Sequence, residues 1–462
     1  MMLLLLLACA GPASISLDGD VDTAPLVDDT APPDDTAPPD TDPPAPIVAD
    51  IAVAVHPEVA TILTATWTQL APGETWLSWV LDGETYTSPV RTRDAGPARE
   101  VVLGLPADTV VTVTLHATPS DASEVQLYPA AAATTGPLPF DLPAPTLALS
   151  EPDADPAPFL LTSLDVGPQN FFGPCYVVVL DRAGRVVWYH VTTERRLTLF
   201  PRVAKSGTHV MWEATTYYVP GDPSIFRATL DFEQSSETTI PGLGFTYDEL
   251  ADGRILYDEA ETAYDYHLTR RELDGTDTRL WSCAPWMAPF SVDYWACAAN
   301  TTLYDPVADV VLYSMFQTST VVAIAPETGE IQWELGQFPG GLGFSPDDIQ
   351  LELQHYPNPT PDGTLLLTTH VPGQRRQHIR EFAIADGVAT QVWDYTADGY
   401  YGDYAGEATR LPAGNTLINF GTDGVLREVT PARDVVWELD WAGHLLGHVT
   451  PIDDLYALNQ GW

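Results

Sequence analysis

The sequence predicts an all-β protein, in which a disordered tether leads into a β-sandwich and then into a six-bladed β-propeller. Three observations predict this fold class. Short runs of alternating apolar residues follow the tether, two repeated motifs recur at regular spacing over the rest of the chain, and helical periodicity is nearly absent. At 462 residues, the chain is long enough for two or three domains.

The composition is strongly acidic, with 64 Asp and Glu residues against 20 Lys and Arg residues and a formal net charge of −44. Such a surface repels phosphate backbones, so we expect no nucleic-acid partner. The charge instead favours a solvated, self-repelling exterior, and we expect a monomer.

The N-terminus, MMLLLLLACAG, predicts an exported protein. Its apolar run ends in residues 6–9 (LLAC), which resemble a bacterial lipobox: residues 1–8 would be removed as a signal peptide and Cys9 would be lipidated. The run is short and lacks the basic segment expected of an export signal, and the alternative to a lipobox is a truncated ordinary signal peptide. With a lipid on Cys9, we expect a membrane anchor at the bacterial outer membrane, on the cell surface or in the periplasm.

Residues 9–46 predict a disordered linker. They contain VDDTAPPDDTAPPDTDPPAP, a repeat of Asp, Thr, Ala and Pro without apolar periodicity. Like charges and prolines keep such a segment extended, and it buries too little apolar surface to fold.

Residues 47–137 predict an immunoglobulin-like β-sandwich. Runs such as ATILTATWTQL and TWLSWVLDGETYTSPV alternate apolar and polar residues, with turns every 8–12 residues. Trp67 and the stretch LGLPADT at 103–109 resemble a fibronectin type III domain. We expect this domain to serve as a spacer or a docking module.

Residues 138–462 predict the propeller. One motif recurs as AKSGTHVMW, LADGRILYD, TPDGTLLLTT and LPAGNTLINF, and a second ends in tryptophan at 188, 281, 333, 393 and 437. Repeats of about 45–55 residues with about four short strands each are typical of a propeller, here with six blades. We expect the indole rings to fill the wedges between neighbouring blades.

The cysteines predict one disulfide. In an oxidising compartment, Cys283 and Cys297 are close enough in sequence to close a single loop, which leaves Cys175 unpaired and buried. No C-x-x-C motif or histidine pair accompanies them, so we expect no metal site.

Several stretches of the propeller region resemble the bacterial arylsulfotransferases, which are six-bladed propellers. The similarity extends from about residue 150 to the end and includes FGPCYVVVLDRAGRVVWYH, TTLYDPVADVVLYSMFQTSTVVAIAPETGEIQWELG, QHYPNPTPDGTLLL and GEATRLPAGNTLINFGTDGVLREVTPARDVVWEL. It implies transfer of a sulfuryl group from an aryl sulfate to a phenolic acceptor through a sulfohistidine, by covalent catalysis. It also implies that no cofactor or nucleotide sulfate donor takes part.

The resemblance assigns the nucleophile to His355, which precedes an Asp-Gly turn as the family's histidine does. Other family positions differ. Ala298 stands where the family has a second histidine, two residues before the retained Asn300, and Phe316 stands where it has an arginine. A third histidine is replaced by Tyr247 or, in another alignment, by Phe245.

Residues that follow His355 could supply the missing charge. The catalytic candidates beside His355 are Tyr247, His378 and Arg380, and the binding candidates are Asn300, Arg376 and His370. For His378 and Arg380 the alternative is a solvated edge strand, because alternate residues of a strand face opposite sides. For Tyr247 the alternative is an ordinary buried tyrosine. We expect His444 and His448 to be plain loop residues.

The sequence leaves two functions open. One is an active arylsulfotransferase. The other is a propeller that has lost this chemistry and binds a ligand or partner in an axial funnel lined by residues 284–295. The residues at 298 and 316 matter most, because charge stabilisation of this kind is worth several kcal/mol of barrier.

Overall fold

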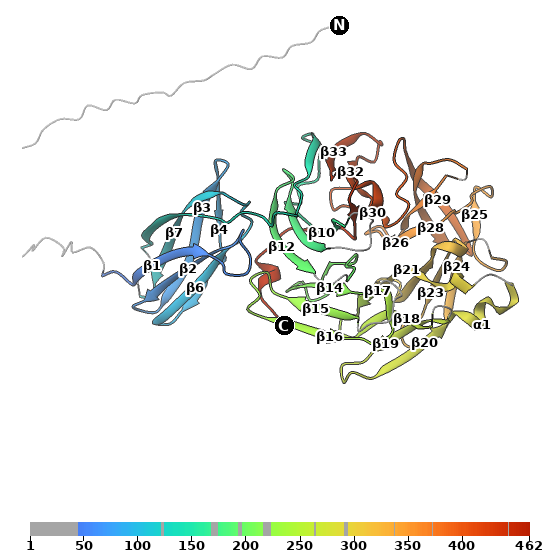
Figure 1. Cartoon of the computed structure of the whole chain (residues 1–462), viewed down its shortest axis with the longest axis horizontal. Helices are drawn as coiled ribbons and strands as arrows, with labels where there is room; N and C mark the ends of the chain where they lie inside the picture. Colours follow the sequence, from blue (N-terminus) through green and yellow to red (C-terminus); the bar gives the residue numbers. More distant parts are fainter. Residues whose placement is uncertain are drawn as a thin grey trace, which may run out of the picture. The chain divides into compact units, whose positions relative to one another are not determined.

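A computed structural model describes residues 45–121, 124–167, 174–192, 196–215, 223–262, 265–290, 294–336, 338–371, 373–441 and 443–462 (Figure 1). The predicted signal peptide, the predicted lipidation site Cys9 and residues 9–44 of the tether lie outside this part of the chain. Residues 46–462 form one compact unit. Its elements are overwhelmingly strands, so the all-β prediction is confirmed. Among the described residues, no helix has the length and apolar character to cross a bilayer.

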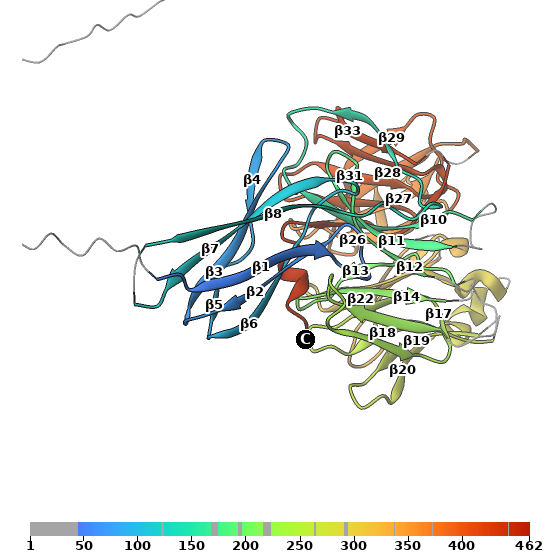
Figure 2. The same cartoon turned by 60° about the vertical axis from the view of Figure 1, so that its left-hand side comes forward.

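The first two sheets form a β-sandwich (Figure 2). One sheet contains β1 (Val48–Val55), β2 (Leu63–Gln69) and β6 (Gly96–Val102); the other contains β3 (Gly73–Leu81), β4 (Glu84–Thr87), β5 (Arg91–Arg93), β7 (Val110–Pro119) and β8 (Gln126–Thr134). Burial alternates along β3 and β7, as the period-2 pattern predicts. Trp67 and Trp79 lie in the core between the sheets.

Six further sheets follow one another along the chain, and Figure 1 shows them in colours from green to red. The first contains β10 (Phe159–Asp165), β11 (Cys175–Asp181), β12 (Val186–Thr192), β34 (Leu445–Leu446) and β35 (Thr450–Ile452). The second contains β13 (Arg202–Val203), β14 (Val210–Ala214), β15 (Ser224–Ala228) and β16 (Ser235–Thr239). The third contains β17 (Leu243–Glu249), β18 (Ile255–Thr262), β19 (Asp265–Arg271) and β20 (Asp277–Ser282).

The remaining three sheets are built in the same way. The fourth contains β21 (Ala299–Asp305), β22 (Val310–Met315), β23 (Thr320–Ile324) and β24 (Ile331–Leu335). The fifth contains β26 (His355–Pro359), β27 (Leu365–His370), β28 (Gln377–Ala385), β29 (Val388–Ala397) and the parallel edge strand β25 (Gly343–Ser345). The sixth contains β30 (Gly406–Arg410), β31 (Thr416–Phe420), β32 (Val425–Val429), β33 (Val435–Asp440) and β9 (Thr146–Ser150).

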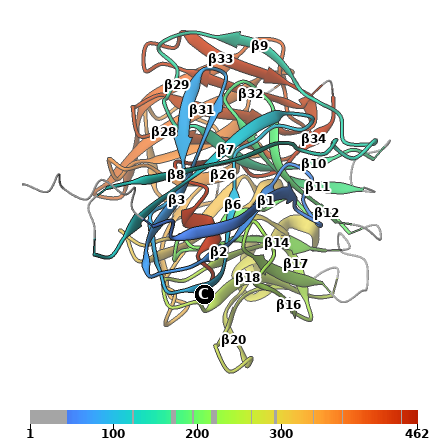
Figure 3. The same cartoon turned by 90° about the vertical axis from the view of Figure 1, so that its left-hand side faces the viewer.

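The chain closes this propeller-like ring at two places. β34 and β35 near the C-terminus pair with β10, so they supply the innermost strand of the first sheet. β9, which precedes the ring in sequence, pairs with β33 at the outer edge of the sixth sheet, and Figure 3 shows these two strands side by side. The first sheet thus contains strands from the C-terminal end of the chain, and the sixth sheet contains a strand that precedes the ring in sequence.

Gly447 allows the closing segment to pass close to its neighbours. A Cβ atom there would lie 2.1 Å from the Ser163 Oγ and 2.4 Å from the Leu199 carbonyl oxygen, so only glycine fits. The backbone N–H of the next residue, His448, donates to that same Leu199 oxygen at 2.6 Å. The closing segment therefore reaches the second sheet as well as the first.

The tryptophans of the second motif pack between neighbouring sheets, as predicted. Trp188 of the first sheet donates its Nε1–H to the Leu230 carbonyl of the second sheet at 2.7 Å. Trp281 packs edge-on against Tyr313 of the fourth sheet, with ring centroids 5.3 Å apart. The rings of Trp393 and Trp437 likewise donate to carbonyls of the following sheet.

Helices are few and short within the described residues. They are α1 (Cys283–Met287) and the 3₁₀ turns η1 (Ala288–Phe290), η2 (Tyr294–Cys297), η3 (Phe316–Thr318), η4 (Gly421–Asp423) and η5 (Ala457–Asn459). α1 and η2 lie in the loop between the third and fourth sheets, where Cys283 and Cys297 form a disulfide. Cys175 is unpaired and buried on β11.

The sandwich packs directly on the ring. Residues of both belong to one apolar core, which includes Leu103 from the sandwich and Leu455 from the C-terminal segment. The Tyr456 hydroxyl donates to the Val101 carbonyl at 2.9 Å. The sandwich is therefore docked on the ring. A domain that moved freely would not share an apolar core with it.

Glu428 links the first and sixth sheets from a fully buried position on β32. One of its carboxylate oxygens accepts hydrogen bonds from the Asp155 backbone N–H and from the Asn415 side-chain amide, both at 2.6 Å. The other forms an ion pair with Arg182 in the turn between β11 and β12. Both oxygens of this buried carboxylate are thus bonded. Through Arg182, Glu428 joins the sixth sheet to the first, where the ring closes.

We predict that Glu428→Ala lowers the free energy of unfolding by about 3–5 kcal/mol, because it leaves the Arg182 charge and two donors without their buried partner. Urea denaturation followed by tryptophan fluorescence measures this change. The matched control is Arg433→Ala, which breaks an exposed ion pair with Asp394 and should cost about 1 kcal/mol or less. Equal effects of the two substitutions would contradict a closing role for Glu428.

Candidate functional site

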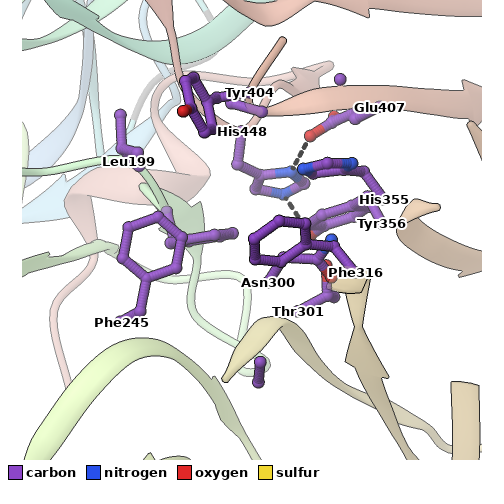
Figure 4. Close-up of a pocket in the computed structure, with 14 residues that line it drawn as sticks. Leu199, Phe245, Asn300, Thr301, Phe316, His355, Tyr356, Tyr404, Glu407 and His448 are labelled. Carbon is purple, nitrogen blue, oxygen red and sulfur yellow. Dashed lines mark hydrogen bonds and ion pairs between the residues drawn. The ribbon is translucent and has the colours of Figure 1, made fainter. Parts of the chain in front are cut away.

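A cavity lies on the axis of the ring, since every one of the six sheets contributes to its lining from its innermost strand or from the segment next to it (Figure 4). Its volume is about 60 Å³. Its lining consists of Leu199, Phe200, Phe245, Ala299, Asn300, Thr301, Phe316, His355, Tyr356, Tyr404, Ala405, Gly406, Glu407 and His448.

Two consecutive residues of β26, His355 and Tyr356, both line this cavity. In a regular strand, neighbouring side chains point to opposite faces. Tyr356 has a left-handed backbone with a φ of 46°, and the pairing of β26 with β27 shifts register between His355 and Asn358. This local irregularity brings both side chains to one side, at an energetic cost that is typical of functional sites.

His355 is held as a neutral imidazole with one ring nitrogen available. Its Nδ1–H donates to the Leu353 carbonyl oxygen at 2.9 Å, which assigns the lone pair to Nε2. The hydrogen bond of this ring within the described residues is made by Nδ1, and none is made by Nε2. The ring is only 8% exposed, and this burial lowers the pKa of His355 to about 4. The nearby His370 ring lowers the pKa further.

A second chain of polar groups faces the same cavity. The His448 Nδ1–H donates to a Glu407 carboxylate oxygen at 2.9 Å, and the Val449 backbone N–H donates to the other oxygen at 3.1 Å. The Tyr356 hydroxyl lies 3.1 Å from the His448 Nε2, and Figure 4 shows both links as dashed lines. Carboxylate, imidazole and phenol are thus joined in a line that can carry a proton.

The Tyr356 phenol is buried beside this chain. Burial raises the pKa of Tyr356 well above its usual value of 10, and the positive charge of Arg202 partly opposes that increase. The ring also stacks on His448 with centroids 4.6 Å apart. At neutral pH the phenol therefore keeps its proton and can donate it through the hydroxyl.

The rest of the lining is mainly apolar and aromatic, with Phe200, Phe245 and Phe316 as its larger side chains. The Phe316 ring lies 5.9 Å from the His355 ring. A benzene molecule occupies a cavity of about 150 Å³, which is larger than this one. An aromatic ligand must therefore displace a lining side chain, and Tyr404 is the most accessible of these at 44% exposed.

No lysine or arginine is among the residues that line the cavity in the described part of the chain. The arginine that influences it is Arg202, which is buried on β13 and forms an ion pair with Asp248. Its guanidinium lies over the Tyr247 ring, 4.7 Å from the centroid. The positive charge of Arg202 acts on the cavity through the lining residue Tyr356, whose pKa it lowers against the effect of burial.

The structure brings together some of the predicted site residues. His355, Asn300 and Phe316, which stands in place of the expected arginine, all line the cavity. Ala298 is buried, and it directly precedes the lining residue Ala299 in the chain. The Asn300 amide donates to the Gln354 carbonyl at 2.7 Å, next to His355. His370 lies behind His355, with its ring stacked on Tyr401, and it is not part of the lining.

Four other predictions need correction, because the structure places these residues outside the cavity. Tyr247 is fully buried in the apolar core beneath it, although its hydroxyl has no partner among the described residues. His378 and Arg380 lie on β28, the third strand outward, where they bond to Asp394 and Gln391. Arg376 is half-buried and pairs with Asp398. His378, Arg380 and Arg376 are thus each already held by a partner on or beside the fifth sheet.

A further correction concerns the ring entrance. Residues 284–290, expected to form an axial funnel, do not line the cavity; they form α1 and η1 beside the disulfide instead. Part of the predicted stretch, residues 291–293, lies outside the described residues.

Sequence reasoning missed Tyr356, Glu407 and His448 as site residues. His448 was expected to be a plain loop residue, yet it projects into the cavity from between β34 and β35. One signal could have revealed it. A propeller that closes with its C-terminal strand places that strand on the axis, so a histidine in it deserves the same weight as one in any other innermost strand.

Comparisons with models of protein families and with curated proteins found no match. Solved structures do match, with low identity. A protein of unknown function from Bacteroides caccae shares 14% identity over 64% of this chain and 99% of its own, with a TM-score of 0.45. A Lactobacillus plantarum protein shares 12% identity over 81% of this chain and 99% of its own, with a TM-score of 0.41. A virginiamycin B lyase from Staphylococcus aureus shares 12% identity over 63% of this chain and 88% of its own, with a TM-score of 0.39. The propeller-like fold is shown by the sheet topology of this chain itself.

We predict that His355 stays neutral far into the acid range, because its burial opposes the charged form. Nitrogen-15 NMR of the imidazole should show the Nδ1–H tautomer above about pH 4, whereas histidine in the urea-unfolded chain titrates near 6.5. The unfolded state then binds more protons between these values, so His355 contributes to a loss of stability as the pH falls from 6.5 to about 4. A folded-state titration near pH 6.5 would contradict this assignment.

Proposed function

We propose that the axial cavity is the active site of a sulfuryl transferase that uses His355 as its nucleophile. The observation that carries this proposal is the bare Nε2 of a neutral, buried imidazole, in the same cavity as a proton-carrying chain of Tyr356, His448 and Glu407. The aromatic lining suits aryl sulfates and phenols, the substrate class that the arylsulfotransferase resemblance implies.

In the first half of the reaction, the His355 Nε2 attacks the sulfur of an aryl sulfate. An N–S bond forms, the S–O bond to the aryl oxygen breaks, and the electron pair leaves with a phenolate. When the His448 ring carries a proton on both nitrogens, its Nε2–H passes a proton to Tyr356, whose hydroxyl gives its own proton to the phenolate. Glu407 stabilises the positive charge on His448 whenever that ring is protonated.

In the second half, a phenolic acceptor occupies the same position. Its hydroxyl loses a proton to the chain of Tyr356 and His448, its oxygen attacks the sulfur, and the N–S bond to His355 breaks. An aryl sulfate leaves and the neutral imidazole is restored, so atoms and charges balance over the cycle. We also propose, from the sequence, that a lipid on Cys9 anchors the enzyme outside the cytoplasm.

A second candidate function is favoured by one observation: no cationic side chain lines the cavity in the described residues. Sulfuryl oxygens require such donors in the transition state. A propeller that binds phenolic ligands without turnover would have the aromatic lining and lack the cations. The two candidates are separated by measuring turnover.

We predict that the purified protein transfers the sulfuryl group from a chromogenic aryl sulfate to phenol, and that His355→Ala lowers kcat/KM by about a thousandfold or more. Mass spectrometry of the protein quenched with donor alone should find one sulfuryl group on a peptide that contains His355. Release of the donor's chromogenic phenolate, measured by absorbance, provides the rate.

Two control variants sharpen this experiment. Tyr356→Phe removes the proton donor and leaves the ring, so it should slow turnover with little change in affinity for the donor. His378→Ala alters a histidine outside the cavity and should leave the rate unchanged. The absence of both turnover and sulfuryl labelling in the wild type would favour the binding function.

We predict that Phe316→Arg raises kcat/KM by about tenfold or more, because the position lines the cavity and a guanidinium there would meet the sulfuryl oxygens. Phe316→Leu is the matched control, since it opens similar space without adding charge. Equal activation by both variants would mean that space, rather than charge, limits the reaction.

A further inference from the structure

Outside the cavity, three potential metal ligands converge at the hairpin that joins β18 to β19. They are Glu261 at the end of β18 and Asp265 and His267 on β19, and their ligand atoms all lie within 4.8 Å of one another. The hairpin belongs to the third sheet, and its place can be followed at β18 and β19 in Figure 1. The proposed reaction makes no use of these residues.

The His267 ring points its free nitrogen into this cluster. The residue is only 4% exposed, and its Nε2 is buried without a hydrogen-bond partner among the described residues. On the other side, Nδ1 lies 2.9 Å from the Ser282 Oγ, which fixes the plane of the ring. With the proton on Nδ1, the Nε2 lone pair faces the two carboxylates, which is the arrangement that metal-binding histidines use.

The distances between the three side chains suit a common metal ion better than hydrogen bonds from one side chain to another. The His267 Nε2 lies 3.3 Å from an Asp265 oxygen and 3.6 Å from a Glu261 oxygen. At 3.3 Å the atoms are near each other, yet they do not meet the geometry of a hydrogen bond. A tetrahedral ion with bonds of about 2.0–2.1 Å holds its ligands about 3.3–3.4 Å apart. All three ligand atoms lie within 4.8 Å of one another, so one ion between them could contact all three side chains.

We propose that Glu261, Asp265 and His267 bind a zinc ion. One imidazole nitrogen and two carboxylate oxygens are a zinc ligand set, and three protein ligands leave the fourth tetrahedral position for water. Calcium prefers six to eight oxygens and magnesium an octahedron of oxygens, so a buried imidazole disfavours both. This site departs from the sequence-based expectation of no metal, which considered cysteines and paired histidines.

Arg279 is the charged neighbour that the ion must tolerate. It pairs with Glu261 at 2.7 Å and with Glu259 at 2.7 Å. A carboxylate has lone pairs on both sides of each oxygen, so Glu261 can keep its arginine while it binds a metal. The same arginine holds Glu261 in position at the hairpin end.

The experiment is a titration of the full chain with zinc chloride by isothermal calorimetry, after dialysis against a chelator. Excess calcium chloride is present to occupy the acidic surface. We expect one saturable zinc site per chain. Loss of an outer-shell partner alone costs about 10–100-fold in affinity, so His267→Ala should weaken binding at least about tenfold. Cobalt in place of zinc should give the visible absorption of a tetrahedral N,O site.

Two variants make the result decisive. Asp265→Asn removes a ligand at a more exposed position, so it tests the site even where loss of the buried ring disturbs the fold. His378→Ala is the matched control, because that imidazole lies beside a carboxylate at 3.1 Å in a true hydrogen bond. Binding that is absent in the wild type, or that is unchanged in both His267→Ala and Asp265→Asn, overturns the proposal.

Discussion

The closing segment, residues 445–452, determines both the stability of the ring and the composition of its site. Its strands complete the first sheet by pairing with β10, and Gly447 lets it approach the second. Between its two strands lies His448, which meets Glu407 of the sixth sheet and Tyr356 of the fifth. The polar chain in the cavity exists only when the ring is closed, because its three members are far apart in sequence.

Charge is distributed unevenly between the surface and the axis. The chain has 64 acidic residues and 20 basic ones, and most arginines are held in ion pairs with carboxylates. Few cations are therefore left for the cavity, which is lined by aromatic rings and two imidazoles. Its reactivity would depend on a neutral nucleophile and proton transfer, with the field of Arg202 acting from behind Tyr356.

Hydrophobic and tryptophan patterns can be recognised in the sequence, whereas the strained backbone of Tyr356 cannot. Period-2 runs and recurring tryptophans predict strands and wedges, because each depends on residues nearby in the chain. The backbone of Tyr356 depends on its tertiary surroundings, and no glycine marks its left-handed φ. The same limit applied to His378 and Arg380, whose distance from the axis depends on which strand of the sheet is innermost.

The sequence by itself determined the all-β class and the wedge role of the tryptophans, and it drew attention to His355, which lines the axial cavity. It also paired Cys283 with Cys297, which are joined in the structure. Only the tertiary structure decided that Tyr356, His448 and Glu407 share the cavity with His355, and that no arginine of the described segments lines it. The physical reason is that a propeller collects one short segment from each distant repeat at its axis, and alternation within a strand cannot tell which segments meet there.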